Sequence, residues 1–258
     1  YKLAPIQVVT WGHPDTTGNV NIDYFISSEL IEKPGSENQY TEKLIKLSLL
    51  PTFYIRPQVP KRVFQRSDFG FDETGPLYVC PQTLFKFHPC FDEIIGNLLT
   101  KDKKGSLVLI DDGKGGHWND LLRDRIGRVY PDVVKRLVFT PRMDNEKFLG
   151  LLILADAILD VPTFSGGNTS LEAFAMGAPI VTWPGEFMRT RVTAGCYKQM
   201  GLSEYVVQSD EEYISFAFTL ANDKDFKIAV QKKIRANSHK LFERIEVIRE
   251  LEKFFVNI

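Results

Sequence analysis

The sequence predicts a doubly wound α/β fold built on a parallel sheet. Short apolar runs alternate with longer helical patterns over most of the 258 residues. Alternation of this kind indicates βαβ units, which form parallel sheets. The runs are apolar throughout, as expected of strands that are buried on both faces. A chain of this length can form one large domain or two smaller ones.

The composition is that of an ordinary globular protein. Apolar residues make up 43% and charged residues 25% of the chain, which excludes disorder for most of it. Lys and Arg number 32 against 33 Asp and Glu, a net charge of -1, so no overall field attracts nucleic acid or an anionic membrane. No apolar run approaches the ~20 residues that span a bilayer. We therefore expect neither nucleic acid nor a membrane span, and any bound anion must be held by a local site.

The three cysteines, Cys80, Cys90 and Cys196, lie far apart. Their odd number argues against a disulfide framework, and their spacing does not match a zinc site. This usage is typical of a reducing compartment, and we expect a cytoplasmic protein. Because the chain enters a strand-like run soon after Tyr1, with no signal-type segment, we expect it to be a piece of a longer protein.

We predict a domain boundary near residue 66, which separates residues 1–66 from residues 67–258. In the first unit, residues 6–10 and 22–26 predict strands, and an apolar pattern resumes at residues 40–50. A connector follows, because prolines block regular strand pairing. Its prolines and basic residues are Pro51, Arg56, Pro57, Pro60, Lys61, Arg62 and Arg66. The basic residues form a solvated linker or, alternatively, an acceptor-binding surface.

Strands and helices then alternate through the second unit. The predicted strands are residues 77–80, 106–110, 136–140, 157–159 and 179–182. The predicted helices are residues 89–99, 117–129, 144–155 and 169–176, and a helical pattern continues from residue 186 almost to the end. Asp144 is expected to cap its helix and Gly177 to end another. Apolar residues at helical spacing predict core or lobe-bridging packing near the end: Phe242, Ile245, Ile248, Leu251 and Phe255.

The loop that joins the strand at 157–159 to the next helix is the strongest candidate for a ligand site. Ligands of doubly wound sheets bind beyond the carboxyl ends of the strands. Here the chain passes through Gly166 and Gly167 into a helix start, where free N–H groups and the helix dipole favour a phosphate. Asn168, Thr169 and Ser170 add polar side chains.

Glu172 lies about one turn into this helix, within reach of a ribose hydroxyl pair. The alternative is that Thr169 and Glu172 form a capping box, which needs no ligand.

Lys86 follows the strand at residues 77–80 and is flanked by Phe85 and Phe87. A half-desolvated ammonium is suited to neutralising a diphosphate leaving group. The alternative is a surface lysine whose stem lies along apolar surface.

Residues 184–191 either begin a helix or direct Arg189 or Arg191 towards the ligand.

Other motifs point to no chemistry. The glycine-rich residues 111–116 lack the spacing of a phosphate loop, and we interpret them as a flexible turn rather than a metal site. His88, His117 and His239 show no ligand spacing. The sequence has no G-x-S-x-G and no H-E-x-x-H, which argues against serine hydrolases and zincins.

Four segments and one arginine together resemble a known family. In order they are A-P-I-Q-V-V-T-W-G-H-P-D-T-T-G at residues 4–18, L-F-K-F-H-P at 84–89, L-D-V-P-T-F-S-G-G-N-T-S-L-E-A at 159–173, M-G-A-P-I-V-T-W-P-G-E at 176–186, and Arg191. The combination is similar to the C-terminal part of the family 41 glycosyltransferases. That family includes O-linked N-acetylglucosamine transferases, SPINDLY proteins and bacterial cytoplasmic N-glucosyltransferases.

The resemblance implies a GT-B architecture, in which two Rossmann-like domains hold a nucleotide sugar in the cleft between them. It also implies roles for individual residues. Lys86 would meet the diphosphate, with Thr83 and Arg191 as further contacts. At the helix start, Thr169 and Ser170 would hold phosphate, and Glu172 would bind ribose.

The remaining implied contacts concern the sugar and the base. Gly166, Gly167 and Asn168 would line the sugar-phosphate pocket. The backbone near Arg142 and Met143 would contact the base. Gly12, His13 and Pro14 would face the transferred sugar, and His13 is the residue best placed to contact the acceptor or act as the base.

Three departures from the family pattern stand out. Gly167 replaces a histidine of the N-acetylglucosamine enzymes. Asn145 and Phe148 stand where a lysine and a histidine are usual, which leaves the base open. The N-terminal catalytic half of the family is absent, and residues 1–66 look like its tail, so that half is an expected partner.

The expected function is metal-independent glycosyl transfer without a cofactor. A hexose, N-acetylglucosamine or another, would move from a UDP-linked donor to a hydroxyl or amide acceptor on protein. A lysine and a helix N-terminus would stabilise the leaving diphosphate without a metal. The alternatives are a nucleotide-sugar-binding fragment without turnover and a nucleotide-sugar epimerase of the same fold.

Overall fold

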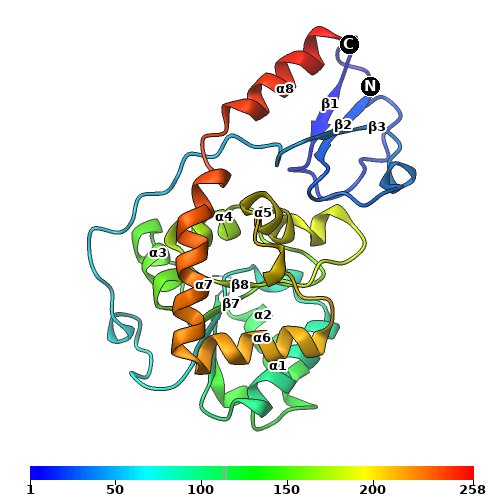
Figure 1. The fold of residues 1–258 in the computed structure, drawn as a ribbon. Coiled ribbons are helices and arrows are strands. Elements are labelled where there is room, and N and C mark those ends of the chain that lie inside the picture. Colours follow the sequence, from blue (N-terminus) through cyan, green and yellow to red (C-terminus); the bar gives the residue numbers. More distant parts are fainter. Residues whose placement is uncertain (112, 114) are drawn as a thin grey trace.

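Two parallel sheets with flanking helices confirm the predicted α/β class (Figure 1). The computed structural model describes residues 1–111, 113 and 115–258. The strands are β1 (Val8–Thr10), β2 (Tyr24–Ser28), β3 (Lys43–Leu47), β4 (Leu77–Cys80), β5 (Ser106–Ile110), β6 (Leu137–Thr140), β7 (Ala157–Leu159) and β8 (Ile180–Val181). The helices are α1 (Pro89–Lys101), α2 (His117–Gly127), α3 (Asn145–Leu154), α4 (Asn168–Met176), α5 (Val192–Met200), α6 (Asp210–Asn222), α7 (Lys224–Asn237) and α8 (Ile245–Val256).

The larger sheet has the strand order β6-β5-β4-β7-β8, with all neighbours parallel. The chain winds outwards from β4 through β5 to β6, and then returns to the other side of β4 for β7 and β8. The winding direction therefore reverses between β4 and β7. Loops on the two sides of such a switch point diverge and leave a crevice for a ligand.

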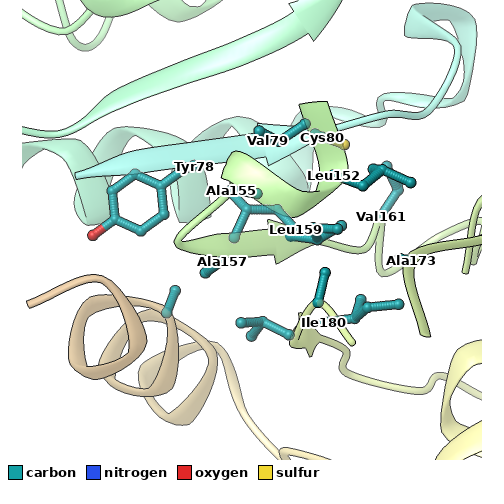
Figure 2. Packing of buried hydrophobic residues seen from close by; sticks show 14 of the residues in the cluster. Tyr78, Val79, Cys80, Leu152, Ala155, Ala157, Leu159, Val161, Ala173 and Ile180 are labelled. Carbon is teal, nitrogen blue, oxygen red and sulfur yellow. The ribbon is translucent and has the colours of Figure 1, made fainter. Parts of the chain in front are cut away.

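The centre of this sheet is buried on both faces, as its apolar runs predict. Tyr78, Val79 and Cys80 on β4 have no exposed surface. Figure 2 shows these side chains near Leu159 of β7 and Leu152 of α3. Helices thus cover the sheet, and only the ends of its strands are free to build a site.

Two local signals work as predicted. The Asp144 carboxylate accepts a hydrogen bond of 2.8 Å from the Lys147 N–H and caps α3. Gly177 ends α4 with a φ of 75°, a conformation that favours glycine.

The smaller sheet, β1-β2-β3, is also parallel and is covered by the last helix, α8 (Figure 1). Ile26 and Leu47 of this sheet form a buried cluster with Val247 of α8. Phe25, on the opposite face of β2, joins the main core. The smaller sheet therefore lies between the second unit and α8, which follows the second unit's other helices in the chain.

The five apolar residues predicted to pack near the end of the chain differ in burial, and Ile248 is partly buried. Phe242 is buried in the main core, and Leu251 packs on the small cluster of the first sheet. Ile245 and Phe255 are exposed, so for these two the prediction of packing is wrong.

The connector, residues 51–65, contains neither helix nor strand. Arg56 and the following Arg66 are less solvated than expected, whereas Lys61 and Arg62 are exposed. The Arg56 guanidinium donates hydrogen bonds to the Ala175 carbonyl and the Ser238 hydroxyl. Arg66 forms an ion pair of 3.1 Å with Asp156. These two side chains attach the connector to the second unit.

Among the described residues, no helix has the length and apolar character that a membrane span requires.

Candidate functional site

A cleft of about 480 Å³ opens at the switch point of the larger sheet, within the size range of ligand sites. Loops that follow β1, β4 and β7 surround it, together with the segment that leads into α5. The lining residues are Trp11, Gly12, Pro14, Pro81, Gln82, Thr83, Lys86, Phe164, Ser165, Gly167, Asn168, Thr169, Met188, Arg189 and Val192. Both candidate loops identified from the sequence thus meet in one cavity.

Gln82 connects the two loops. Its side-chain carbonyl accepts a hydrogen bond of 3.2 Å from the Lys86 ammonium, and its amide N–H donates one of 3.1 Å to the Thr169 hydroxyl. Lys86 and Thr169 are therefore separated by a single side chain. A diphosphate placed in the cleft would lie within reach of both.

The aromatic surroundings of Lys86 differ from the expected ones. Its ammonium lies 4.0 Å from the ring centroid of Phe164, on the other loop. Phe85 is 64% exposed, while Phe87 is buried in the core. Phe164 is thus the ring that contacts the Lys86 ammonium.

The charge on Lys86 is destabilised by its position. Burial lowers its pKa below the ordinary value of 10.5, while the negative charge of Asp160 opposes that shift. A bound phosphate would favour the charged ammonium again. Thr83, on the same loop, has a buried hydroxyl without a hydrogen-bond partner, so it can bond to a ligand in the cleft.

The loop from β7 to α4 is shaped by Asp160, which was not predicted from the sequence. The buried carboxylate accepts a hydrogen bond of 2.7 Å from the Gly166 N–H and one of 2.8 Å from the Ser165 hydroxyl. The Thr182 hydroxyl donates a third, of 2.7 Å. Burial raises the pKa of Asp160, and these hydrogen bonds oppose the shift.

The two glycines of this loop have different surroundings. A Cβ on Gly166 would lie 2.3 Å from the Ser170 hydroxyl and 2.6 Å from the Gln82 amide, so a larger residue would displace these side chains. A Cβ on Gly167 would meet only the Trp11 ring, at 3.9 Å. Gly167 faces the cleft, whereas Gly166 lies behind its lining.

The capping-box interpretation of Thr169 and Glu172 is wrong. Gly167 is the N-cap residue of α4, and no side chain caps the helix. Asn168 and Thr169 line the cleft at the helix start, beside N–H groups that no side chain caps.

Ser170 does not face the cleft, although it was predicted as a phosphate contact. It is buried, and its hydroxyl pairs with the Thr193 hydroxyl at 2.7 Å. Its position in the first turn of α4 turns the side chain towards α5 instead of the cleft.

The predicted base and ribose contacts also lie outside the cleft lining. Glu172 is half-buried in α4, and its carboxylate accepts a hydrogen bond of 3.4 Å from Asn145; burial raises its pKa. Arg142 and Met143 follow β6, two strands away from the centre of the sheet. Their roles remain predictions.

The loop after β1 brings Gly12 and Pro14 to the cleft. His13 between them is exposed and outside the lining, and its Nδ1 lies 2.6 Å from the Asp15 carbonyl. The buried Glu42 carboxylate holds this loop through the Thr17 N–H at 2.8 Å.

Arg189, rather than Arg191, lines the cleft. The Arg189 guanidinium forms an ion pair with Asp15. Arg191 is buried and donates hydrogen bonds to the carbonyls of Ile31, at 3.0 Å, and Gly185, at 2.8 Å. Its guanidinium therefore joins the segment after β2 to the loop after β8 and lies outside the cleft lining, so its ligand contact stays a prediction.

Several lining residues were missed by sequence reasoning. Trp11 and Gln82 lie next to predicted residues, and Phe164 lies two residues before Gly166, all in loops already identified. The available signal was their place in loops that follow strands, which does not tell which side chains turn inwards.

In the described part of the chain, no group of three or more His, Cys, Asp or Glu is suitably placed for a metal ion. The predicted flexible turn at residues 111–116 lies partly outside the described residues, since 112 and 114 are not among them.

The chain is similar in sequence to curated proteins that are named as glycosyltransferases. The chain is 30% identical to the protein of Arabidopsis thaliana named "probable UDP-N-acetylglucosamine--peptide N-acetylglucosaminyltransferase SEC", over 98% of this chain and 26% of that protein. It is 26% identical to the corresponding SPINDLY protein of Hordeum vulgare, over 91% of this chain and 25% of that protein. The chain thus spans about a quarter of the length of these curated relatives.

Among solved structures, the chain is similar to a mutant O-GlcNAc transferase of Thermobaculum terrenum. The TM-score is 0.85 at 27% identity, and the match covers 98% of this chain and 48% of that one. The doubly wound sheet is therefore the Rossmann-like domain of a GT-B fold. Because the model of glycosyl transferase family 41 matches residues 57–250, most of the sequence, the chain belongs to that family.

Proposed function

We propose that this chain forms the donor-binding part of a metal-independent glycosyltransferase. In this proposal, the cleft binds a nucleoside-diphosphate sugar, UDP-linked, and the complete protein transfers its hexose to a hydroxyl or amide of a protein acceptor. The single observation that carries the proposal is the Lys86–Gln82–Thr169 connection at the switch point of the sheet.

The chemistry needs two kinds of help from the protein. As the bond between the anomeric carbon and the β-phosphate oxygen breaks, the diphosphate gains negative charge and the sugar becomes oxocarbenium-like. The acceptor must also lose a proton to a base. Lys86 and the N–H groups at the start of α4 supply the first kind of help, because a cation and a helix N-terminus both stabilise an anion.

No metal is required for that part of the reaction. The ammonium of Lys86 takes the place of a divalent cation as the neutralising charge, and Arg189 is a second cation on the cleft lining. The neighbouring hydroxyls of Thr83 and Thr169 contribute hydrogen bonds to phosphate oxygens.

The second kind of help is removal of the acceptor proton. His13 lies between Gly12 and Pro14, which line the cleft, so we propose it as a sugar or acceptor contact.

The relatives support the donor and the acceptor. Both curated relatives carry names that specify UDP-N-acetylglucosamine and a peptide. Because the chain spans about a quarter of each, the activity and the acceptor belong to the proposal for the complete protein. The three cysteines are free, which supports the proposed cytoplasmic location.

The binding test is a calorimetric titration with UDP and with GDP. Lys86→Ala should weaken the affinity for the diphosphate that binds by about tenfold to a hundredfold, as expected for the loss of a charged hydrogen bond. Lys101→Ala is the matched control. Lys101, at the end of α1, also lies over an aromatic ring, with its ammonium 4.8 Å from the ring centroid of Phe218. Unchanged affinity in the Lys86 variant would refute the site.

The reaction test uses the complete protein with a UDP-sugar and a protein acceptor. Transfer of the sugar to the acceptor is the expected result. Diphosphate binding without turnover would favour a binding module, and a changed sugar without any acceptor, detected by NMR, would favour an epimerase.

A further inference from the structure

Asp160 is a buried carboxyl group that the proposed reaction does not use. It is the first residue after β7, is 3% exposed, and does not line the cleft. Burial of a carboxylate is costly unless donors surround it. Its presence behind the cleft therefore calls for a physical reason.

The partners of Asp160 all belong to the structure that surrounds the donor site. One carboxylate oxygen accepts the Gly166 N–H, and the other accepts the hydroxyls of Ser165 and Thr182. Gly166 and Ser165 form the turn that precedes α4, while Thr182 follows β8. The carboxylate therefore fixes the turn to the sheet.

The hydrogen bonds continue from this turn to two helices. The Thr193 N–H of α5 donates to the Ser165 hydroxyl at 3.0 Å. The Thr193 hydroxyl pairs with that of Ser170, in the first turn of α4, at 2.7 Å. Through these groups, the position of the start of α4 depends on the carboxylate of Asp160.

Gly166 is closely packed against three side chains. A Cβ on Gly166 would lie 2.3 Å from the Ser170 hydroxyl, 2.6 Å from the Gln82 amide and 2.8 Å from the Thr169 hydroxyl, so one of them would have to move. A shift of Gly166 would thus displace Gln82, which contacts Lys86, and Thr169 at the helix start. Both groups proposed to hold the diphosphate are coupled to this turn.

We propose that Asp160 is a positioning residue for diphosphate binding. Its carboxylate holds the Gly166–Gly167 turn, and with it the N–H groups at the start of α4, in the conformation that receives the donor's phosphates. The inference rests on the proposed donor-binding function. A negative charge behind the turn also favours the protonated form of Lys86.

The test compares UDP with uridine in the complete protein, because only UDP carries the diphosphate; GDP and guanosine replace them if GDP binds more tightly. Asp160→Asn keeps the shape of the side chain but replaces one accepting oxygen with an amide group that donates. We expect the affinity for the diphosphate, measured by calorimetry, to fall by about tenfold or more. The affinity for the nucleoside, measured by ligand-observed NMR, should stay within about twofold.

Tyr213→Phe is the matched control. The Tyr213 hydroxyl is buried and donates to the main-chain carbonyl of Asp160 at 2.8 Å, but it does not touch the turn. This variant should lower the melting temperature without changing the ratio of diphosphate to nucleoside affinity. Thr182→Val, which removes one donor and keeps the charge, should lower the diphosphate affinity by a smaller factor, and it serves as the test if Asp160→Asn does not fold.

The outcomes separate the two proposals. If the unchanged protein binds neither UDP nor GDP, the proposed function fails, and this inference fails with it. The proposed function stands if the unchanged protein binds a diphosphate. The positioning role is then refuted if Asp160→Asn, or Thr182→Val in its place, lowers the diphosphate and nucleoside affinities equally or lowers neither.

Discussion

Lys86 has an amide, rather than a carboxylate, as its hydrogen-bond partner. The Gln82 oxygen that accepts its hydrogen bond carries no net charge, and burial makes the ammonium less stable than in water. The charge is therefore available to an anion. A lysine whose main role was structural would gain more from a carboxylate partner.

The pH dependence of donor binding follows from this environment. Burial lowers the pKa of Lys86 below 10.5, so the neutral amine forms at a lower pH than in an ordinary lysine. We expect the affinity for UDP to fall as pH rises through that lowered pKa, and binding to take up protons in the same range. Calorimetry in buffers of different ionisation enthalpy measures both effects.

Lys86→Arg is the control for this prediction, since arginine stays charged throughout the range. Its affinity for UDP should show no loss on the alkaline side. An affinity of the unchanged protein that stays constant up to pH 10 or so would contradict the assignment.

At the scale of elements, the turn before α4 offers a sharp comparison between adjacent glycines. Gly166→Ala would place a Cβ 2.3 Å from the Ser170 hydroxyl, and overpacking of this kind costs about 1–3 kcal/mol of unfolding free energy. Gly167→Ala would meet Trp11 at an ordinary 3.9 Å and should cost less. Urea unfolding of both variants checks the order, and equal losses would be inconsistent with the packing described.

The loop after β1 depends on Glu42, whose carboxylate accepts hydrogen bonds from Thr16 and Thr17. Burial raises its pKa, but these hydrogen bonds outweigh burial and lower it from 4.5 to about 2. Because the folded-state pKa is depressed, the stabilisation is fully present above pH 4.5 and is lost as pH falls towards 2.

Glu42→Gln should therefore lower the unfolding free energy by about 1.5–3 kcal/mol near neutral pH. The difference from the unchanged protein should shrink as the solution is acidified. Denaturant unfolding at several pH values measures this, and a difference independent of pH would exclude the carboxylate as its source.

Elements with strong local signals are those that the sequence predicts well. Residues 77–80 and 106–110 are strands at the expected positions, and Asp144 and Gly177 bound their helices as expected. Thr169 does not cap its helix, although the local pattern of a capping box is present. The Gln82 amide, distant in sequence, donates a hydrogen bond to the Thr169 hydroxyl, and Gly167 occupies the cap position.

The candidate site was predictable at the level of loops but not of side chains. Lys86 and Gly167 follow from residue type and place after a strand. Asp160 was missed because, in sequence, it is one polar residue among several, and its burial arises only when β8 and α5 pack around it. Ser170 and Arg191 turn away from the cleft for the same reason: their partners come from other elements.

At the scale of the whole molecule, α8 connects the last part of the chain to the first sheet. Val247 is 1% exposed in the cluster with Ile26 and Leu47. Val247→Ala should lower the unfolding free energy by roughly 1–3 kcal/mol, as for other large-to-small core changes. Hydrogen exchange should accelerate in β2 and β3 while β4 and β5 stay protected, because stability varies locally.

Ile245→Ala on the same helix is the control, since Ile245 is 52% exposed. It should leave exchange in β2 and β3 nearly unchanged. Uniform acceleration across both sheets in the Val247 variant would indicate that the two units unfold together.

The docking of α8 also bears on how the polypeptide matures on the ribosome. The Ser48 N–H donates a hydrogen bond to the Glu250 carboxylate, 202 positions away in the sequence. Strands β2 and β3 are therefore synthesised before α8, and their outer face is covered only after the second unit has been translated. During that interval the apolar face of β2 and β3 is open to chaperones or to unwanted association. In a nascent chain halted before residue 245, that face would remain exposed to water.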